Sequence, residues 1–257
     1  MLSLQRQTFL LALLSLGLFP ATARATWSIV ILDRATNRIG VVGASCTGDV
    51  YGIMGLLPGK GVLIAQGISS TPSIKLGMKL LGEGAPADSV WRVIGDSVTD
   101  QQLSIRQYAV ATLSGTFVQY SGAATPDYHG DRRATDVFIQ GNTLPGAAVL
   151  DSVMSAIQTA RARKLNLEDV LMAGLQAGAD AGGDKRCGSQ RAKSAFLVVA
   201  RPDEPVGRPY LSIIIYGDNS VNAVDFLHQK LSQWEASDGT KNVRSRMDFW
   251  PDTSSHK

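Results

Sequence analysis

The chain passes from a leader segment into a β-strand within the stretch Ala23-Arg24-Ala25-Thr26-Trp27-Ser28-Ile29-Val30. Apolar and β-branched residues continue to Asp33, which indicates a strand. Cleavage after Ala25 would make Thr26 the first residue and give it a free α-amine beside its own hydroxyl. An N-terminal threonine can act as a nucleophile because its own amine serves as the base. The stretch therefore indicates both where the fold begins and a candidate catalytic group.

The residues before this strand predict a secretory signal peptide, residues 1–25. An apolar run from Phe9 to Phe19 is followed by small residues, as at a cleavage site. Cleavage after Ala23 and cleavage after Ala25 both fit the small-x-small rule, and we expect the second because the strand pattern begins directly after it. The run is shorter than the ~20 apolar residues that cross a bilayer. We therefore expect a periplasmic or secreted protein without a membrane span.

The charge of the chain argues against nucleic acid as a partner. The whole sequence has 25 lysines and arginines and 22 acidic residues, and removal of Arg6 and Arg24 with the leader leaves 23 basic residues. Binding to nucleic acid depends on a clustered basic surface that neutralises phosphates. The apolar fraction of 44% is ordinary for a globular protein. We expect one domain over residues 26–236 and a polar tail over residues 237–257; the sequence permits a homo-oligomer without predicting one.

The cysteines and histidines indicate a disulfide and no metal site. Cys46 and Cys187 are the two cysteines, and an even number in an oxidising compartment favours a disulfide over two buried thiols. His129, His228 and His256 are scattered without metal-ligand spacing. The glycines form neither a phosphate-binding loop nor a dinucleotide-binding fingerprint, so we expect no cofactor.

The order of elements predicts an α+β fold. We expect strands at residues 26–33, 39–45, 61–67, 107–113, 117–120, 136–140, 195–201 and 210–216, and helices at residues 72–82, 86–94, 146–163, 166–181 and 221–234. Strands and helices do not alternate regularly, which argues against a doubly wound parallel sheet. Paired helices between groups of apolar strands favour a four-layer αββα sandwich of two antiparallel sheets.

The first two strands form a predicted hairpin around residues 34–38, with Asn37 in the turn. Antiparallel pairing about this turn places Thr26 opposite Ser45 to Thr47. The strand that leads to Cys46 therefore ends beside the new N-terminus.

A bridge between Cys46 and Cys187 would bring a charged loop to the same strand end, because a disulfide holds its two Cα atoms within ~7 Å. The loop carries Asp184, Lys185 and Arg186. A cation lowers the pKa of a neighbouring amine, and Asp184 could hold the α-amine through a hydrogen bond. The alternative is an ordinary solvated loop.

Amide hydrolysis also requires donors for the developing oxyanion. Asn142 and Ser45 are candidates because each lies at the end of a predicted strand. Both residue types also bond local backbone in turns, which is the alternative interpretation.

Four segments stand in order along the chain: Thr26-Trp27-Ser28-Ile29-Val30, Ile39-Gly40-Val41-Val42-Gly43-Ala44-Ser45, Gln140-Gly141-Asn142 and Ala181-Gly182-Gly183-Asp184-Lys185-Arg186. They resemble the domain of unknown function 1028 family, which is placed among the N-terminal nucleophile (Ntn) hydrolases. The resemblance covers about Thr26 to Arg201. It implies the αββα sandwich and amide-bond hydrolysis, with Thr26 at the position of the presumed nucleophile and Asn142 and Asp184 within shared motifs. Family members often carry a basic residue where Cys46 stands, so the tuning of the amine differs here.

Two functions fit these observations. The first is an exported amidohydrolase in which Thr26 attacks a small amide or peptide and forms an acyl-enzyme, with Asn142, Asp184, Ser45 and Lys185 as candidate assisting residues. The second is a non-catalytic binding domain on the same scaffold. A free Thr26 amine is required by the first and not by the second.

Overall fold

The computed structural model describes residues 26–125, 127–217, 221–237 and 245–249. The predicted signal peptide and most of the predicted tail lie outside these residues. No helix in the described part of the chain combines the length and the apolar character needed to cross a membrane.

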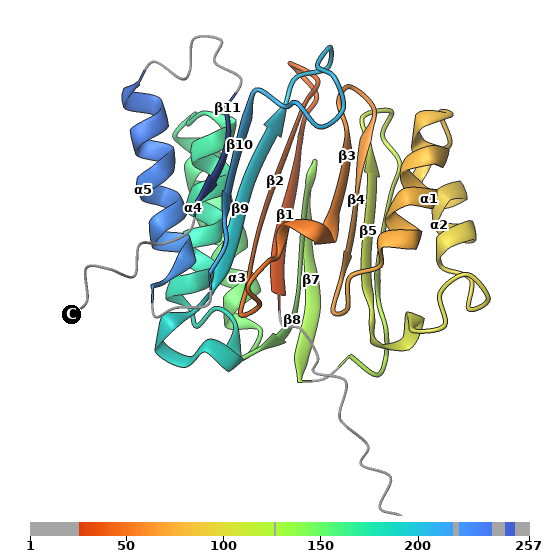
Figure 1. Ribbon diagram of the computed structural model, residues 1–257, viewed down its shortest axis with the longest axis horizontal. Coiled ribbons are helices and arrows are strands. Elements are labelled where there is room, and N and C mark those ends of the chain that lie inside the picture. Colours follow the sequence, from red (N-terminus) through yellow and green to blue (C-terminus); the bar gives the residue numbers. More distant parts are fainter. Residues whose placement is uncertain (1–25, 126, 218–220, 238–244, 250–257) are drawn as a thin grey trace, which may run out of the picture.

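Two sheets form the centre of the protein (Figure 1). The larger has the strand order β11-β10-β9-β2-β1-β8-β7 and the smaller the order β3-β4-β5-β6. Neighbouring strands are antiparallel except for β10 and β11, which are parallel. The strands are β1 (Thr26–Asp33), β2 (Arg38–Ser45), β3 (Met54–Leu57), β4 (Gly61–Gln66), β5 (Gln107–Thr112), β6 (Phe117–Ser121), β7 (Tyr128–Ala134), β8 (Val137–Leu144), β9 (Ser194–Ala200), β10 (Leu211–Ile215) and β11 (Ser245–Phe249).

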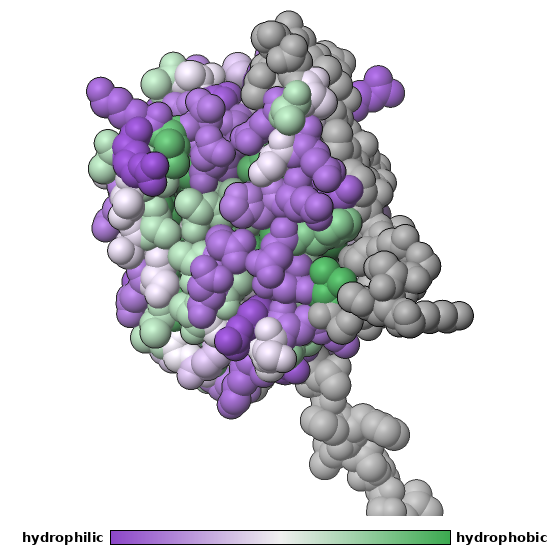
Figure 2. All heavy atoms as spheres, turned by 90° about the vertical axis from the view of Figure 1, so that its left-hand side faces the viewer, coloured by the Kyte–Doolittle hydropathy of each residue, from purple (hydrophilic) through white to green (hydrophobic). Residues whose placement is uncertain are grey.

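Helices cover the outer face of each sheet, which gives four layers (Figure 1). The larger sheet is covered by α3 (Ala148–Ala162), α4 (Leu167–Asp180) and α5 (Ala223–Ala236), and the smaller by α1 (Thr71–Gly82) and α2 (Ala87–Ile94). Three apolar clusters separate the layers: one under each helical layer and one between the sheets. On the side that carries α5, Figure 2 shows hydrophilic residues with apolar ones interspersed. The four layers agree with the order of elements predicted from the sequence.

Strand β1 is central to the larger sheet and is buried on both faces. Trp27 and Ile29 pack toward the helices, whereas Val30 and Leu32 pack between the sheets. Side chains on a strand alternate between its faces, so Thr26 shares the inter-sheet face with Val30 and Leu32. The inter-sheet layer is therefore apolar along most of β1 and polar where the strand begins.

The predicted register of the first hairpin is confirmed, because Thr26 pairs with Ser45 and Asp33 with Arg38. On its other side β1 pairs with β8, and Thr26 stands opposite Asn142. The first residue of β1 thus lies between two polar residues that are far from it in sequence.

Four strands differ from the prediction. The residues of β3 were expected to be loop because the segment around this short, half-buried edge strand is rich in glycine. The residues of β7 were expected to be a polar loop, because this partly buried edge strand carries charged residues and therefore lacks an apolar strand pattern. The following strand was expected to end near Asn142, but β8 continues to Leu144. β11 falls within the residues predicted as a tail and extends the sheet beside β10.

Candidate functional site

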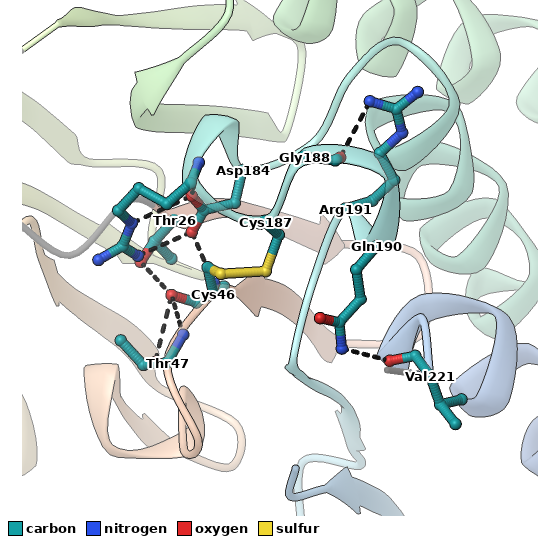
Figure 3. Close-up of a disulfide and its surroundings, with 11 residues drawn as sticks. Thr26, Cys46, Thr47, Asp184, Cys187, Gly188, Gln190, Arg191 and Val221 are labelled. Atoms are coloured by element: carbon teal, nitrogen blue, oxygen red, sulfur yellow. Dashed lines mark hydrogen bonds and ion pairs between the residues drawn. A yellow bond between two sulfur atoms is a disulfide. The ribbon is translucent and has the colours of Figure 1, made fainter. Parts of the chain in front are cut away.

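Thr26 is nearly inaccessible, with 2% of its surface exposed. Its Oγ1 donates a hydrogen bond to Ser45 Oγ over 3.3 Å. Ser45 Oγ also accepts from the backbone N–H of Thr47 at 3.3 Å and lies 3.2 Å from the Thr47 hydroxyl oxygen. These contacts place three hydroxyl groups at one strand end (Figure 3).

A chain of buried amides supports Thr26 from the opposite sheet. Gln66 Nε2 donates to the carbonyl oxygen of Thr26 at 3.4 Å and to Gln107 Oε1 at 2.9 Å. Asn142 Nδ2 donates to the same Gln107 oxygen at 3.1 Å. Gln66 Oε1 accepts from Ser28 Oγ at 2.6 Å. Because buried polar groups are costly unless they are hydrogen-bonded, this network fixes β1 and β8 relative to the smaller sheet.

A disulfide joins Cys46 to Cys187, with the Cα atoms 5.5 Å apart (Figure 3). This is the pairing that the cysteine count favoured, and it brings the predicted charged loop to the end of β2. Asp184 is fully buried, and its Oδ2 accepts a hydrogen bond from the backbone N–H of Cys46 at 2.6 Å. The carboxylate therefore holds the residue next to Ser45 in place.

The cation that contacts Asp184 is Arg186. Its guanidinium lies 2.8 Å from Asp184 Oδ2, and its backbone N–H donates to Oδ1 at 3.0 Å. Lys185 was expected to lie beside Thr26, but its ammonium forms an exposed ion pair with Asp127 at 3.0 Å. The reason is the short helix η3 (Lys185–Gln190), in which adjacent side chains point in different directions.

Gly183 makes the approach of this loop to the sheet feasible. Its φ of 56° lies in the left-handed region, and a Cβ atom there would stand 2.8 Å from the carbonyl oxygen of Arg191. Since only glycine adopts this conformation at little cost, the pair Gly182-Gly183 ends α4 and turns the chain directly into Asp184.

A cavity of about 160 Å³ opens beside Thr26. Of the predicted site residues, Thr26 alone lines it; Ser45 and Asn142 flank Thr26 in the neighbouring strands and are fully buried. Polar residues at the ends of otherwise apolar strands, such as Gln66, are the sequence signal that could have indicated the wall of this cavity. The remaining lining residues belong to two loops, and the sequence does not predict that these loops lie next to each other. The lining consists of Thr26, Thr47, Asp49, Val50, Gly52, Ile53, Gln66, Gly67 and Ser69.

One wall of the cavity is held by a buried ion pair. Arg106 donates to the carbonyl oxygen of Ile68, which lies between two lining residues, and it pairs with Asp100 at 2.5 and 2.9 Å. Burial opposes ionisation of Asp100, but hydrogen bonds from Arg106 and Tyr108 outweigh it and lower the pKa of this carboxyl. Burial, together with donation to Asp100, raises the pKa of Tyr108 to about 12. The wall is thus anchored by a charged group that stays ionised at neutral pH.

Four larger cavities among the described residues lie away from Thr26. One of about 370 Å³ beside β3 has a mainly apolar lining that includes Met54, Ile74 and Met78. A second, of about 450 Å³, contains Arg34 and Arg38, which pair with Asp136 and Asp33. The third, of about 410 Å³, has a mainly exposed lining on α4 and α5, and the fourth, of about 220 Å³, includes Lys60 and Thr112. None of these four linings joins a hydroxyl nucleophile to a cluster of buried polar groups. We therefore assign the candidate site to the smaller cavity.

Among the residues that the structure describes, no group of three or more His, Cys, Asp or Glu side chains could hold a metal ion. The side chains at the cavity offer hydroxyl, amide and carboxylate groups. In the unprocessed chain the nitrogen of Thr26 is part of the peptide bond to Ala25, so the α-amine forms only after cleavage at that bond.

A family model described as a family of unknown function, DUF1028, matches residues 26–224. The crystal structure of protein SPO2555 from Silicibacter pomeroyi, which is described with the same family, is similar to this chain. The two share 23% sequence identity and superpose with a TM-score of 0.69, over 86% of this chain and 94% of that one. At this identity the likeness concerns the fold. No curated protein matches the chain.

Proposed function

The chain belongs to the DUF1028 family, and we propose that it is an exported amidohydrolase of the Ntn type whose nucleophile is Thr26. The four-layer arrangement is the scaffold that the Ntn hydrolases use, and the disulfide suits an oxidising compartment. The substrate would be a small amide or peptide. The observation that carries the proposal is the position of Thr26 as the first residue of a central strand, at the wall of a cavity and against a network of buried polar groups.

The proposed reaction starts from the chain cleaved after Ala25. Thr26 Oγ1 attacks the carbonyl carbon of the amide and passes its proton to its own α-amine, which has an unperturbed pKa of about 7.7–8.0. The C–N bond breaks as this proton moves to the leaving nitrogen, and an ester to Oγ1 remains. Water then attacks the ester and gives a proton to the amine. The ester C–O bond then breaks as the amine returns this proton to Oγ1, which releases the acid and restores Thr26 with its free amine.

Neighbouring residues would assist this reaction in distinct ways. Asn142 and Ser45 stand on either side of Thr26 but do not line the cavity, so we assign to them the positioning of Thr26 rather than the stabilisation of the oxyanion. The amide chain through Gln107 fixes the orientation of Asn142. Asp184 and Arg186 act as positioning residues, because they hold Cys46 and thereby the end of β2. We assign no role in the reaction to Lys185, since it pairs with Asp127 at the surface.

Turnover by Thr26 variants tests the proposal. Each variant is exported with the full leader, its N-terminus is sequenced, and its release of amine from a set of amides is measured. Thr26→Ala should abolish turnover, whereas Thr26→Ser should retain it because a hydroxyl remains beside the amine. Equal turnover by Thr26→Ala and the unaltered protein would refute the role of Thr26.

A second function is a non-catalytic binding domain on the same scaffold. The apolar cavity of about 370 Å³ beside β3 favours it, since its size is within the ~300–1,000 Å³ typical of ligand pockets. This function predicts that Thr26→Ala leaves the affinity for the ligand unchanged and that no amide is hydrolysed. The release assay separates the two.

A further inference from the structure

The loop that follows Cys46 presents a carboxylate to the cavity beside Thr26. Asp49 is one of the lining residues and is exposed to solvent. Its Oδ1 accepts a hydrogen bond from the backbone N–H of Tyr51 at 2.8 Å, and its carbonyl oxygen accepts from Thr47 Oγ1 at 3.1 Å. Asp49 Oδ2 has no hydrogen-bond partner within the described part of the chain. One carboxylate oxygen is thus held by the loop, and the other is left to bind water or a ligand.

The loop itself is anchored to the larger sheet. Gly48 accepts a hydrogen bond from the backbone N–H of Gly217 at 3.1 Å, just beyond the end of β10. Val50 and Ile53 are buried on the other side of Asp49 and belong to the inter-sheet cluster. Because contacts on both sides fix the backbone, the Asp49 carboxylate is preorganised rather than carried on a loose loop.

Asp49 is the charged side chain of the cavity, and the α-amine of mature Thr26 is the other ionisable group there. Of the nine described lining residues, eight are uncharged and Asp49 is acidic. The nearby charges compensate one another: Asp184 pairs with Arg186, and Lys185 pairs with Asp127. A cationic group that enters the cavity therefore meets a carboxylate without a competing side-chain cation among the lining residues.

The volume restricts the size of that group. At about 160 Å³ the cavity is smaller than the ~300–1,000 Å³ of pockets that enclose a drug-sized ligand. It suits one side chain of a substrate rather than a whole ligand. The uncharged lining beside Asp49 includes Val50 and Ile53, which would contact an aliphatic stem.

We infer that the site recognises amides that carry an ammonium or guanidinium group on a short aliphatic stem, and that Asp49 binds this cation while the amide lies at Thr26. The inference rests on the proposed function for the reaction itself, but recognition of the cation is measurable without turnover. Hydrogen bonds between charged partners are stronger than those between neutral groups. Basic amino acid derivatives are accordingly the substrate class expected.

Binding to the mature Thr26→Ala protein tests the inference, because this variant cannot consume its ligand. The probes are Nα-acetyl-lysinamide and Nα-acetyl-norleucinamide, which differ by the terminal ammonium, and the measurement is isothermal titration calorimetry. We expect lysinamide to bind about 10-fold more tightly, and Asp49→Asn to remove this preference. Asparagine keeps the oxygen that accepts from Tyr51, so the loop is retained, and affinity for norleucinamide reports whether the cavity is intact.

Asp203→Asn is the matched control, since it makes the same change in net charge. Asp203 follows β9, whose last residue, Ala200, pairs with Ile39 at the end of the sheet opposite Ser45. This variant should keep the preference for lysinamide. Equal affinity for the two amides, binding of neither, or a preference that survives Asp49→Asn would overturn the inference.

Turnover by the protein with Thr26 intact separates this inference from the proposed function. The lysine and norleucine 4-nitroanilides serve as substrates. Hydrolysis of both without a preference contradicts only the inference, whereas binding that depends on Asp49 without any hydrolysis contradicts only the proposed function. If Asp49→Asn shifts the pH dependence of turnover equally for both substrates, then the carboxylate acts on the α-amine of Thr26, and the inference is wrong.

Discussion

Replacement of Asp184 by asparagine should weaken the strand end that carries the candidate site. The carboxylate is fully buried and accepts from the backbone N–H groups of Cys46 and Arg186, at 2.6 and 3.0 Å, and from the Arg186 guanidinium at 2.8 and 3.1 Å. An asparagine side chain has one acceptor oxygen instead of two and no charge, so at least one of these donors loses its partner.

The size of the effect follows from the burial of the carboxylate. A hydrogen bond to a charged group contributes about 1.5–3 kcal/mol, and removal of one partner of a buried ion pair costs about 3–5 kcal/mol. The Arg186 side chain is 30% exposed, so water replaces part of the lost interaction. We therefore expect Asp184→Asn to lower the free energy of unfolding by about 2–4 kcal/mol.

Urea unfolding of the oxidised protein measures this change, and Asp127→Asn is the matched control. Asp127 pairs with Lys185, the residue that follows Asp184 in the chain, but both side chains of this pair are largely exposed. The control should cost about 0–1 kcal/mol. Equal effects of the two substitutions would refute the reasoning that Asp184 holds the end of β2.

Three further predictions concern stability. Reduction of the disulfide, which closes a loop with a sequence separation of 141 residues, should lower the free energy of unfolding by about 2–4 kcal/mol, measured in urea with and without a reductant; an unchanged midpoint would argue against the bridge. Burial raises the pKa of Glu168, because the folded protein favours the protonated carboxyl. The contribution of this carboxyl to stability is therefore present at low pH and is lost as the pH rises through the raised pKa of the folded protein. Glu168→Gln should therefore unfold at higher urea than the unaltered protein at pH 7 but not at pH 3, and the opposite order would contradict the direction of the shift. The pKa of Asp100 is lowered, since hydrogen bonds outweigh burial. Its contribution is present above the unfolded pKa and is lost as the pH falls through the folded value, so Asp100→Asn should destabilise the protein at pH 7 and lose its effect in strong acid; a constant effect across this range would be inconsistent with an ionised Asp100.

The parts of the fold that depend on local pattern could be predicted from the sequence. Thr26 was placed opposite Ser45 to Thr47, and it pairs with Ser45, because a short turn fixes the register of a hairpin to within a few residues. The four layers follow from strands that are apolar on both faces and helices that are apolar on one. The edge strand β7 was missed because half of its residues are polar, and polar residues at an edge resemble a loop.

The site was predictable only where covalent geometry constrains it. The disulfide brings the loop of Asp184 to the sheet, but which of two adjacent cations contacts this carboxylate depends on the turn of η3. Gln66 and Gln107 were missed because their contacts with Thr26 and Asn142 join two different sheets. Asp49 was missed because its position depends on how a Gly-rich loop packs against β10.

The central claim is that Thr26 becomes the first residue and acts as the nucleophile. Its most direct test is mass spectrometry of the exported protein after incubation with an activated ester, followed by peptide mapping. The proposal predicts a chain that begins at Thr26 and carries one acyl group on that residue. A chain that begins at Arg24, or one that begins at Thr26 and stays unlabelled, would contradict it.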